Sequence, residues 1–121
     1  MNAEDAMALA EALNHNDSLK KLDLRWNRIG NHGVKALADM LCQNGSLQKL
    51  ILAGNGIGDE GVKALADALV CNKTLVELSL SGNQIGDEGG MTLVKALKNN
   101  CILKNLDLRW NRMDACSSCK T

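Results

Sequence analysis

Cysteine and histidine are the residues of this chain that could bind a metal or carry redox chemistry. Cys116 and Cys119 have the C-x-x-C spacing of a zinc half-site or a redox pair. A structural zinc site needs four ligands. No second pair has suitable spacing, and His15 and His32 lie far away in the sequence. We therefore predict no metal and no cofactor, and we expect residues 114–121 to form a disordered tail, with reversible thiol chemistry there as the alternative.

Two further patterns resemble catalytic motifs without completing them. Residues 54–58, GNGIG, look like a phosphate-binding loop, but no Gly-Lys-Ser/Thr follows. The equivalent stretch at 26–30 reads WNRIG, which indicates that these glycines are turn residues. Ser79 and Ser81 have no histidine in a position to activate them. We predict that the chain is not an enzyme.

The residue types most typical of protein-binding hot spots, Trp and Arg, occur in two copies of the segment LDLRWNR. One copy contains Arg25 and Trp26, and the other contains Arg109 and Trp110. We predict that these two Arg-Trp pairs act as a clamp that anchors a protein segment. In the alternative interpretation, the segment was duplicated and each tryptophan only shields its own turn.

Both copies belong to a unit that repeats every 28 residues, beginning at Leu19, Leu47, Leu75 and Leu103. Each unit fits the pattern L-x-x-L-x-L-x-x-N-x-L, with Ile or Met at the last position. Alternating leucines in the first half predict a strand, and apolar residues at i, i+3, i+4 and i+7 in the second half predict a helix. We expect strands near 21–25, 49–53, 77–81 and 105–109, and helices near 3–15, 32–43, 60–71 and 88–99.

Polar residues at fixed positions of the unit are expected to satisfy the backbone where the chain changes direction. Asp59 lies where a helix N-cap belongs, and Asn31 and Asp87 are its equivalents. An asparagine follows each strand, and a buried amide there could both donate and accept hydrogen bonds. We predict a structural ladder rather than a ligand site, made of Asn27, Asn55, Asn83 and Asn111.

The phrase N-x-I-G-D-E-G, at residues 55–61 and 83–89, resembles the ribonuclease-inhibitor class of leucine-rich repeats. The even spacing and the phrase ALADALxxNxTL are most similar to the C-terminal repeats of NOD-like receptors. The resemblance implies an α/β solenoid, a right-handed horseshoe segment of about 3.5 repeats with a parallel sheet on the concave side and helices on the convex side. It further implies that the concave strand face binds a protein partner in a regulatory or ligand-sensing role. The alternatives are a regulator of a small GTPase, as in GTPase-activating proteins of the Ran type, and a structural spacer.

The resemblance defines a domain over 1–113. It contains a half-repeat at 2–18, three repeats at 19–46, 47–74 and 75–102, and a partial repeat at 103–113. Neither end has a recognisable capping unit, so terminal strands and leucines would meet water. We therefore expect a fragment of a longer array, a truncated product, or self-association through an open end.

The outward positions of the strands predict what the concave face offers a partner. Asp23 and Asp107 lie beside the Arg-Trp pairs of the outer repeats. Four strands spaced by ~4.8 Å would place Trp26 and Trp110 roughly 15 Å apart. The inner repeats supply Lys49, Ile51 and Glu77, together with a shallow floor of Ala53, Gly54, Ser81 and Gly82.

Composition narrows the class of partner. The formal net charge is zero, which gives no electrostatic preference for nucleic acid or for an anionic membrane. No apolar run approaches the ~18 residues of a membrane span, and the start of the chain lacks the basic region of a signal peptide. A repeat core needs no disulfide bonds, so we expect the five cysteines to be reduced thiols in the cytoplasm.

Overall fold

The fold alternates helices and strands, as the repeat predicts. The computed structural model describes residues 2–100 and 102–112, so the tail predicted at 114–121, with Cys116 and Cys119, lies outside the described residues. The helices are α1 (Ala3–Leu13), α2 (Gly30–Gln43), α3 (Asp59–Cys71) and α4 (Asp87–Leu97). The strands are β1 (Lys21–Asp23), β2 (Lys49–Ile51), β3 (Glu77–Ser79) and β4 (Asn105–Asp107).

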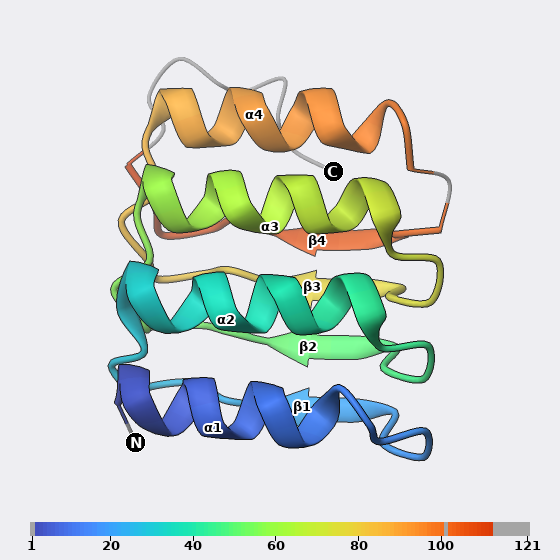
Figure 1. The fold of residues 1–121 in the computed structure, drawn as a ribbon. Coiled ribbons are helices and arrows are strands. Elements are labelled where there is room, and N and C mark those ends of the chain that lie inside the picture. The colour runs from blue at the N-terminus through green and yellow to red at the C-terminus, as the bar shows by residue number, and fades with distance from the viewer. Residues whose placement is uncertain (1, 101, 113–121) are drawn as a thin grey trace.

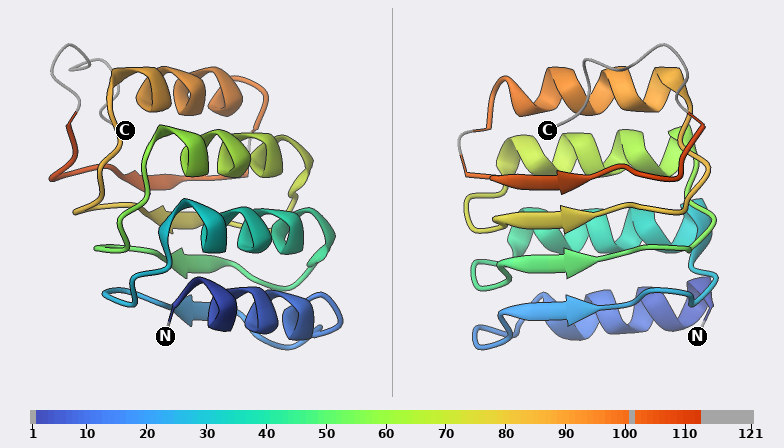
Figure 2. Two further views of the ribbon diagram at one scale, coloured as in Figure 1. Left: turned by 60° about the vertical axis from the view of Figure 1, so that its left-hand side comes forward. Right: turned by 180° about the vertical axis from the view of Figure 1, so that it is seen from behind.

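The strands form one parallel sheet in the order β1-β2-β3-β4. Residues one period apart are direct partners, so that Leu22 pairs with Leu50, Leu50 with Leu78, and Leu78 with Leu106. The helices stack beside one another in a second layer, and they cover one face of the sheet (Figures 1 and 2). The chain is therefore an α/β leucine-rich-repeat solenoid, and the described residues place no helix on the other face of the sheet.

Each strand is shorter than the five residues expected, although its hydrogen bonding continues past its end. The amide of Leu24 donates to the carbonyl of Ile51 at 2.9 Å, and the amide of Trp26 donates to that of Ala53 at 2.9 Å. The amides of Gly54 and Gly82, at the equivalent position, donate to the carbonyls of Ser81 and Arg109. The backbone of the first three turns is therefore tied to the next repeat, and the last turn accepts one of these bonds at Arg109.

Leucine and other aliphatic side chains fill the space between the two layers. Leu50, Leu52, Leu78 and Leu80 are at most 2% exposed, whereas Leu22 and Leu108 in the outer repeats are only partly buried. Burial of such side chains is the main stabilising term, at about 1.5–3 kcal/mol for each one. The inner repeats therefore supply most of the rigid support beneath the sheet.

The predicted helix N-caps are wrong, because Gly58 and Gly86 hold two of these positions, and the side chains of Asn31 and Asp59 bond to the start of the next helix instead of their own. Asn31 lies inside α2, and its Oδ1 accepts hydrogen bonds from the amides of Gly58 at 2.8 Å and Gly61 at 3.0 Å. Asp59, the first residue of α3, accepts from Gly86 at 2.7 Å. Asp87 is likewise the first residue of α4, whose N-cap is Gly86. A sequence reading of one unit at a time assigns the cap to the wrong helix.

The asparagines at the strand ends also connect neighbouring repeats. Asn55 is 1% exposed, and its Oδ1 accepts from the amides of Asn27 at 2.9 Å and Ile29 at 3.3 Å. Its Nδ2 donates to the carbonyls of Leu24 at 2.9 Å and Ala53 at 3.2 Å. One side chain therefore satisfies four backbone groups in two repeats. Equivalent bonds are made by Asn83 and Asn111.

Candidate protein-binding face

The face of the sheet without helices presents the outward side chains of the four strands and of the turns that follow. We call it the strand face. It consists of residues 21, 23, 25 and 26 and of their equivalents in the next three repeats. Trp26 and Trp110, from the turns after β1 and β4, are 71% and 82% exposed. They are the two most exposed large apolar side chains among the described residues.

The two tryptophans occupy a backbone position that favours glycine. Trp26 has φ of 58° and Trp110 has φ of 63°, both in the left-handed region. The inner repeats place Gly54 and Gly82 there, at 65° and 66°. A left-handed backbone costs a side-chain-bearing residue roughly 1–2 kcal/mol, a cost that glycine avoids. The outer repeats therefore carry exposed, bulky side chains where the repeat itself calls for none.

Each tryptophan follows an arginine whose guanidinium is held by the aspartate two residues before it. Arg25 Nε and Nη2 donate to the carboxylate of Asp23, with the shortest separation 2.6 Å. The corresponding ion pair of Arg109 with Asp107 is 2.9 Å. We call these sets, Asp23/Arg25/Trp26 and Asp107/Arg109/Trp110, the Asp–Arg–Trp clusters.

The ion pairs perturb both partners in the direction expected for charge-assisted hydrogen bonds. The side-chain hydrogen bond from Arg25 is the main cause that lowers the pKa of Asp23, and Arg109 lowers the pKa of Asp107 in the same way. The pKa of each arginine is raised by its aspartate. The clusters therefore present paired charges beside an apolar ring, and a partner could accept hydrogen bonds from the remaining arginine N–H groups.

The floor expected between the tryptophans is partly covered by one of them. A side-chain carbon added at Gly54 would overlap the Trp26 ring, and one at Gly82 would lie 3.9 Å from that ring. The indole of Trp26 therefore extends along the strand face over the glycines of the next two repeats. The absence of a side chain at 54 is what allows it to lie there. The surface between the clusters is in part aromatic, unlike the bland floor that the sequence suggested.

The predicted residues of the inner strands lie on the same face. Lys49 and Glu77 are direct neighbours in the sheet and form an ion pair of 3.4 Å between Nζ and Oε2. Ile51 and Ser79 are the next pair along the strands, and both are half-buried. The structure therefore brings Lys49 together with Glu77 and each aspartate together with its arginine. The two clusters remain at opposite edges, on β1 and β4.

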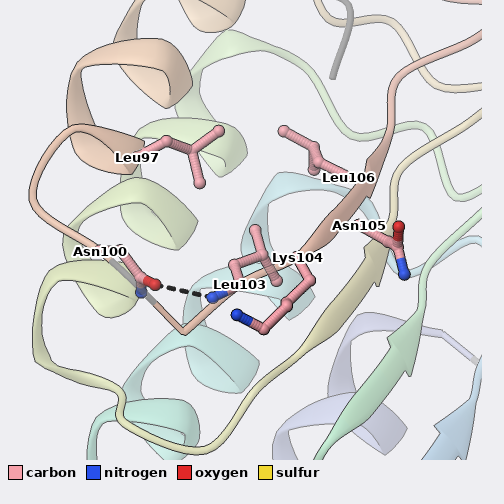
Figure 3. Close-up of a pocket in the computed structure, with 6 residues that line it drawn as sticks. All are labelled: Leu97, Asn100, Leu103, Lys104, Asn105 and Leu106. Carbon is pink, nitrogen blue, oxygen red and sulfur yellow. Dashed lines mark hydrogen bonds between the residues drawn. The ribbon is translucent and has the colours of Figure 1, made fainter.

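A pocket of about 220 Å³ lies beside β4, and no residue of the Asp–Arg–Trp clusters lines it (Figure 3). Two of the residues that line it are hydrogen-bonded to each other, since Asn100 Oδ1 accepts from the amide of Leu103 at 2.8 Å. The equivalent bonds are made by Asn44 and Asn72, so this asparagine also belongs to the repeat. The pocket carries no charged cluster and is lined by Leu97, Asn100, Leu103, Lys104, Asn105 and Leu106.

Sequence reasoning missed two sets of residues. One position in successive repeats, which we call a column, holds Asn16, Asn44, Asn72 and Asn100. It has the same 28-residue spacing as the asparagine ladder, and that spacing was the signal available. Cys42 and Cys71 lie 2.7 Å apart, but they do not share a column of the repeat, so the period gave no signal. Within residues 2–100 and 102–112, no group of three or more His, Cys, Asp or Glu residues could hold a metal ion. In the same part of the chain, no helix has the length and apolar character needed to cross a membrane.

A family model and solved structures both match this chain. Residues 15–38, 43–66 and 71–94 match a family model described as "Leucine Rich repeat". The structure of leiomodin-1 actin-binding site 2 is similar over 89% of this chain, with a TM-score of 0.85 and 33% identity. This chain spans 64% of the length of that one.

A second solved structure shares the fold. The tropomodulin C-terminal domain of Caenorhabditis elegans is similar over 97% of this chain and 86% of its own length, with a TM-score of 0.64. At 14% identity, this similarity concerns the fold alone. A comparison with the curated proteins finds no match.

Proposed function

Since the chain belongs to the leucine-rich repeat family, we propose that it is a non-catalytic module that binds a protein partner on its strand face. The observation that carries this proposal is the left-handed backbone of Trp26 and Trp110. Glycine at these two positions would relieve strain, as it does in the inner repeats. Backbone strain that persists at exposed residues is typical of binding and active sites.

We propose actin as the first partner to test. The support is the similarity to leiomodin-1 actin-binding site 2, which covers most of this chain at 33% identity. The clusters supply the residue types that dominate the energy of protein interfaces. Their paired charges suit a partner that offers a hydrogen-bond acceptor close to an apolar side chain.

The test is a titration of monomeric actin with the chain and with a Trp26→Gly/Trp110→Gly variant. Glycine is chosen because the inner repeats carry it in the same backbone conformation, so the variant is expected to fold. If the tryptophans are anchors, the dissociation constant should rise at least tenfold, the change for a loss of about 1.4 kcal/mol. Calorimetry or fluorescence anisotropy measures this directly.

A matched control removes exposed apolar side chains from the helices. Val70 and Met91 are 47% and 50% exposed, so the Val70→Ala/Met91→Ala variant also loses two such side chains. This control should bind as the parent chain does. Equal weakening by both double variants would contradict the strand face as the binding site. No binding of actin by the parent chain would reject actin and leave a different protein partner to be identified by pull-down.

Narrower functions stay proposals on the same fold. Ligand sensing in the manner of NOD-like receptors is supported by the even spacing and by the phrase ALADALxxNxTL at residues 64–75. If the chain regulates a small GTPase, it should accelerate the hydrolysis of GTP by that GTPase. A structural spacer would bind no partner.

A cytoplasmic location is supported by the free thiols of Cys42 and Cys71, which suit a reducing compartment. Self-association is checked by light scattering of the purified chain.

A further inference from the structure

Cys42 and Cys71 bring two sulfur atoms together on the helix side of the molecule. Cys42 is one residue from the C-terminal end of α2, and Cys71 is the last residue of α3. Their Sγ atoms lie 2.7 Å apart, and both residues are exposed free thiols. A disulfide bond has a length of about 2.05 Å. A disulfide bond would therefore bring the two sulfurs closer by roughly 0.65 Å.

We propose that Cys42 and Cys71 form a reversible dithiol site, which a small-molecule disulfide such as oxidised glutathione converts into a disulfide bond between α2 and α3. This inference does not depend on the partner of the strand face. The helices lie on the other side of the sheet from that face (Figure 2). The proposed site therefore differs from the binding surface in both position and chemistry.

The two sulfurs differ in their surroundings. The Cys71 thiol is placed to donate to the carbonyl of Asp67 at 3.5 Å, and in the contact between the two sulfurs either one can be the donor. Burial of its sulfur, the hydrogen bond to Cys71 and the nearby charges of Asp39 and Asp67 raise the pKa of Cys42 to about 11. The thiolate is the nucleophile in disulfide exchange. Because its raised pKa disfavours the Cys42 thiolate, we assign the first attack to the other sulfur, that of Cys71.

The exchange proceeds in two balanced steps. The Cys71 thiolate attacks one sulfur of oxidised glutathione, the S–S bond of glutathione breaks, and one glutathione thiolate leaves. Cys42 then loses its proton and attacks Sγ of Cys71 in the mixed disulfide, which releases the second glutathione thiolate. The two cysteine thiols are oxidised by two electrons, and the two protons they lose leave on the glutathione thiols. Reduced glutathione in excess reverses both steps.

The nearness of the sulfurs favours the second step over accumulation of a mixed disulfide. A thiol held next to its target reacts at an effective concentration that free glutathione does not reach. The resulting bond closes the chain segment between 42 and 71. Such a closure restricts the unfolded chain, so the oxidised form should melt at a temperature higher by roughly 5–15 °C.

The test exposes the full-length chain to a series of reduced and oxidised glutathione mixtures, followed by acid quenching and peptide mapping. Trypsin separates the two cysteines into peptides 36–49 and 64–73. We expect these peptides to become linked, with the loss of two hydrogens, and the link to disappear in excess reduced glutathione. A chain that carries separate glutathione adducts at both cysteines, or that links them to other cysteines, would overturn the proposal.

Two single variants form the matched control. Cys42→Ser lacks the resolving thiol, so a stable glutathione adduct should accumulate on Cys71. Cys71→Ser lacks the attacking thiol, so its adduct on Cys42 should form more slowly, because burial and the charges of Asp39 and Asp67 still raise the pKa of Cys42. Equal adduct rates in the two variants would overturn the assigned order of attack. Melting curves of the reduced variants that match the parent chain show that the variants are folded and the comparison is valid.

Discussion

Two adjacent columns of the repeat behave in opposite ways, although the same period sets both. The column that begins at Asn27 carries asparagine in all four repeats, and its inner members, Asn55 and Asn83, are at most 6% exposed. The column that begins at Trp26 reads Trp, Gly, Gly, Trp, and its tryptophans are more than two-thirds exposed. The asparagine column holds the turns together, whereas the tryptophan column is where the repeats differ on the surface.

The difference follows from what each position requires. The asparagine must donate and accept at once inside a closed turn, and few side chains can do both. The tryptophan position requires only a left-handed backbone, which glycine meets at the lowest cost. A bulky residue there gains nothing in the turn itself. The comparison therefore separates residues that the fold needs from residues that a partner would need.

The largest expected effect is on the buried asparagine. Asn55→Ala leaves buried donors and acceptors in two repeats without partners, at about 1–3 kcal/mol for each group that water cannot reach. We expect a total loss of about 2–4 kcal/mol in the free energy of unfolding, because some groups will regain water. Urea denaturation followed by circular dichroism measures it.

Asn27→Ala is the matched control for that loss. Asn27 is only partly buried, and its Nδ2 donates to the carbonyls of Leu24 at 2.9 Å and Arg25 at 3.1 Å within its own repeat. These side-chain bonds stay within one repeat, whereas those of Asn55 connect two. The loss at 27 should be less than half of that at 55. Equal losses would show that the bonds between repeats contribute little.

The next effect tests whether the Trp26 ring lies over its glycine neighbour. Gly54→Ala places a side chain in a left-handed backbone and in the space of the ring, whereas Gly56→Ala, at φ of 68°, meets open space. The backbone term should destabilise each variant by about 1–2 kcal/mol, and overlap with the ring should add about 1 kcal/mol at 54 alone. In a Trp26→Gly background the difference between the two variants should vanish. A difference that persists would mean that the ring does not occupy this space.

Most of the fold could be predicted from the sequence because the period is unbroken. The strand columns, the sheet order and the leucine core follow from residues 28 apart becoming direct neighbours. The caps of Asn31 and Asp59 were assigned to the wrong helices because their partners lie in the next unit, where side-chain length and direction decide the contact. The position of the Trp26 ring and the contact between Cys42 and Cys71 likewise depend on where side chains lie, which the repeat period does not predict.

A smaller effect distinguishes glycine from alanine at the tryptophan position. Trp26→Ala removes the ring but keeps a β-carbon in the left-handed region, whereas Trp26→Gly removes both. We expect the glycine variant to be more stable than the alanine variant by about 1 kcal/mol. The same order is expected at Trp110, where φ is 63°. Parallel thermal melts of the four variants measure this difference in stability. Alanine and glycine variants of equal stability would show that the backbone is not strained.

The smallest effect concerns the ion pairs of the clusters and their response to pH. The pKa of Asp23 and that of Asp107 lie below the ordinary value of 3.8 in the folded chain, chiefly because of the arginine hydrogen bonds. For a carboxylate with a lowered pKa, the stabilisation is present above the ordinary value and is lost as pH falls through the folded value. The contribution should therefore be constant from neutral pH to about 5 and decline only below about 4. Both pairs are partly exposed, so the total is small.

Carboxyl carbon chemical shifts in an acid titration resolve this effect at each aspartate. In Arg25→Gln, the midpoint of Asp23 should return toward its ordinary value, while that of Asp107 stays low because Arg109 is unchanged. Arg109→Gln should give the reverse pattern. If Asp23 kept its lowered midpoint without Arg25, the guanidinium would not be its main partner, and Arg25 would be free to meet a binding partner without first leaving an aspartate. The titration therefore determines whether the clusters offer a paired or an available arginine.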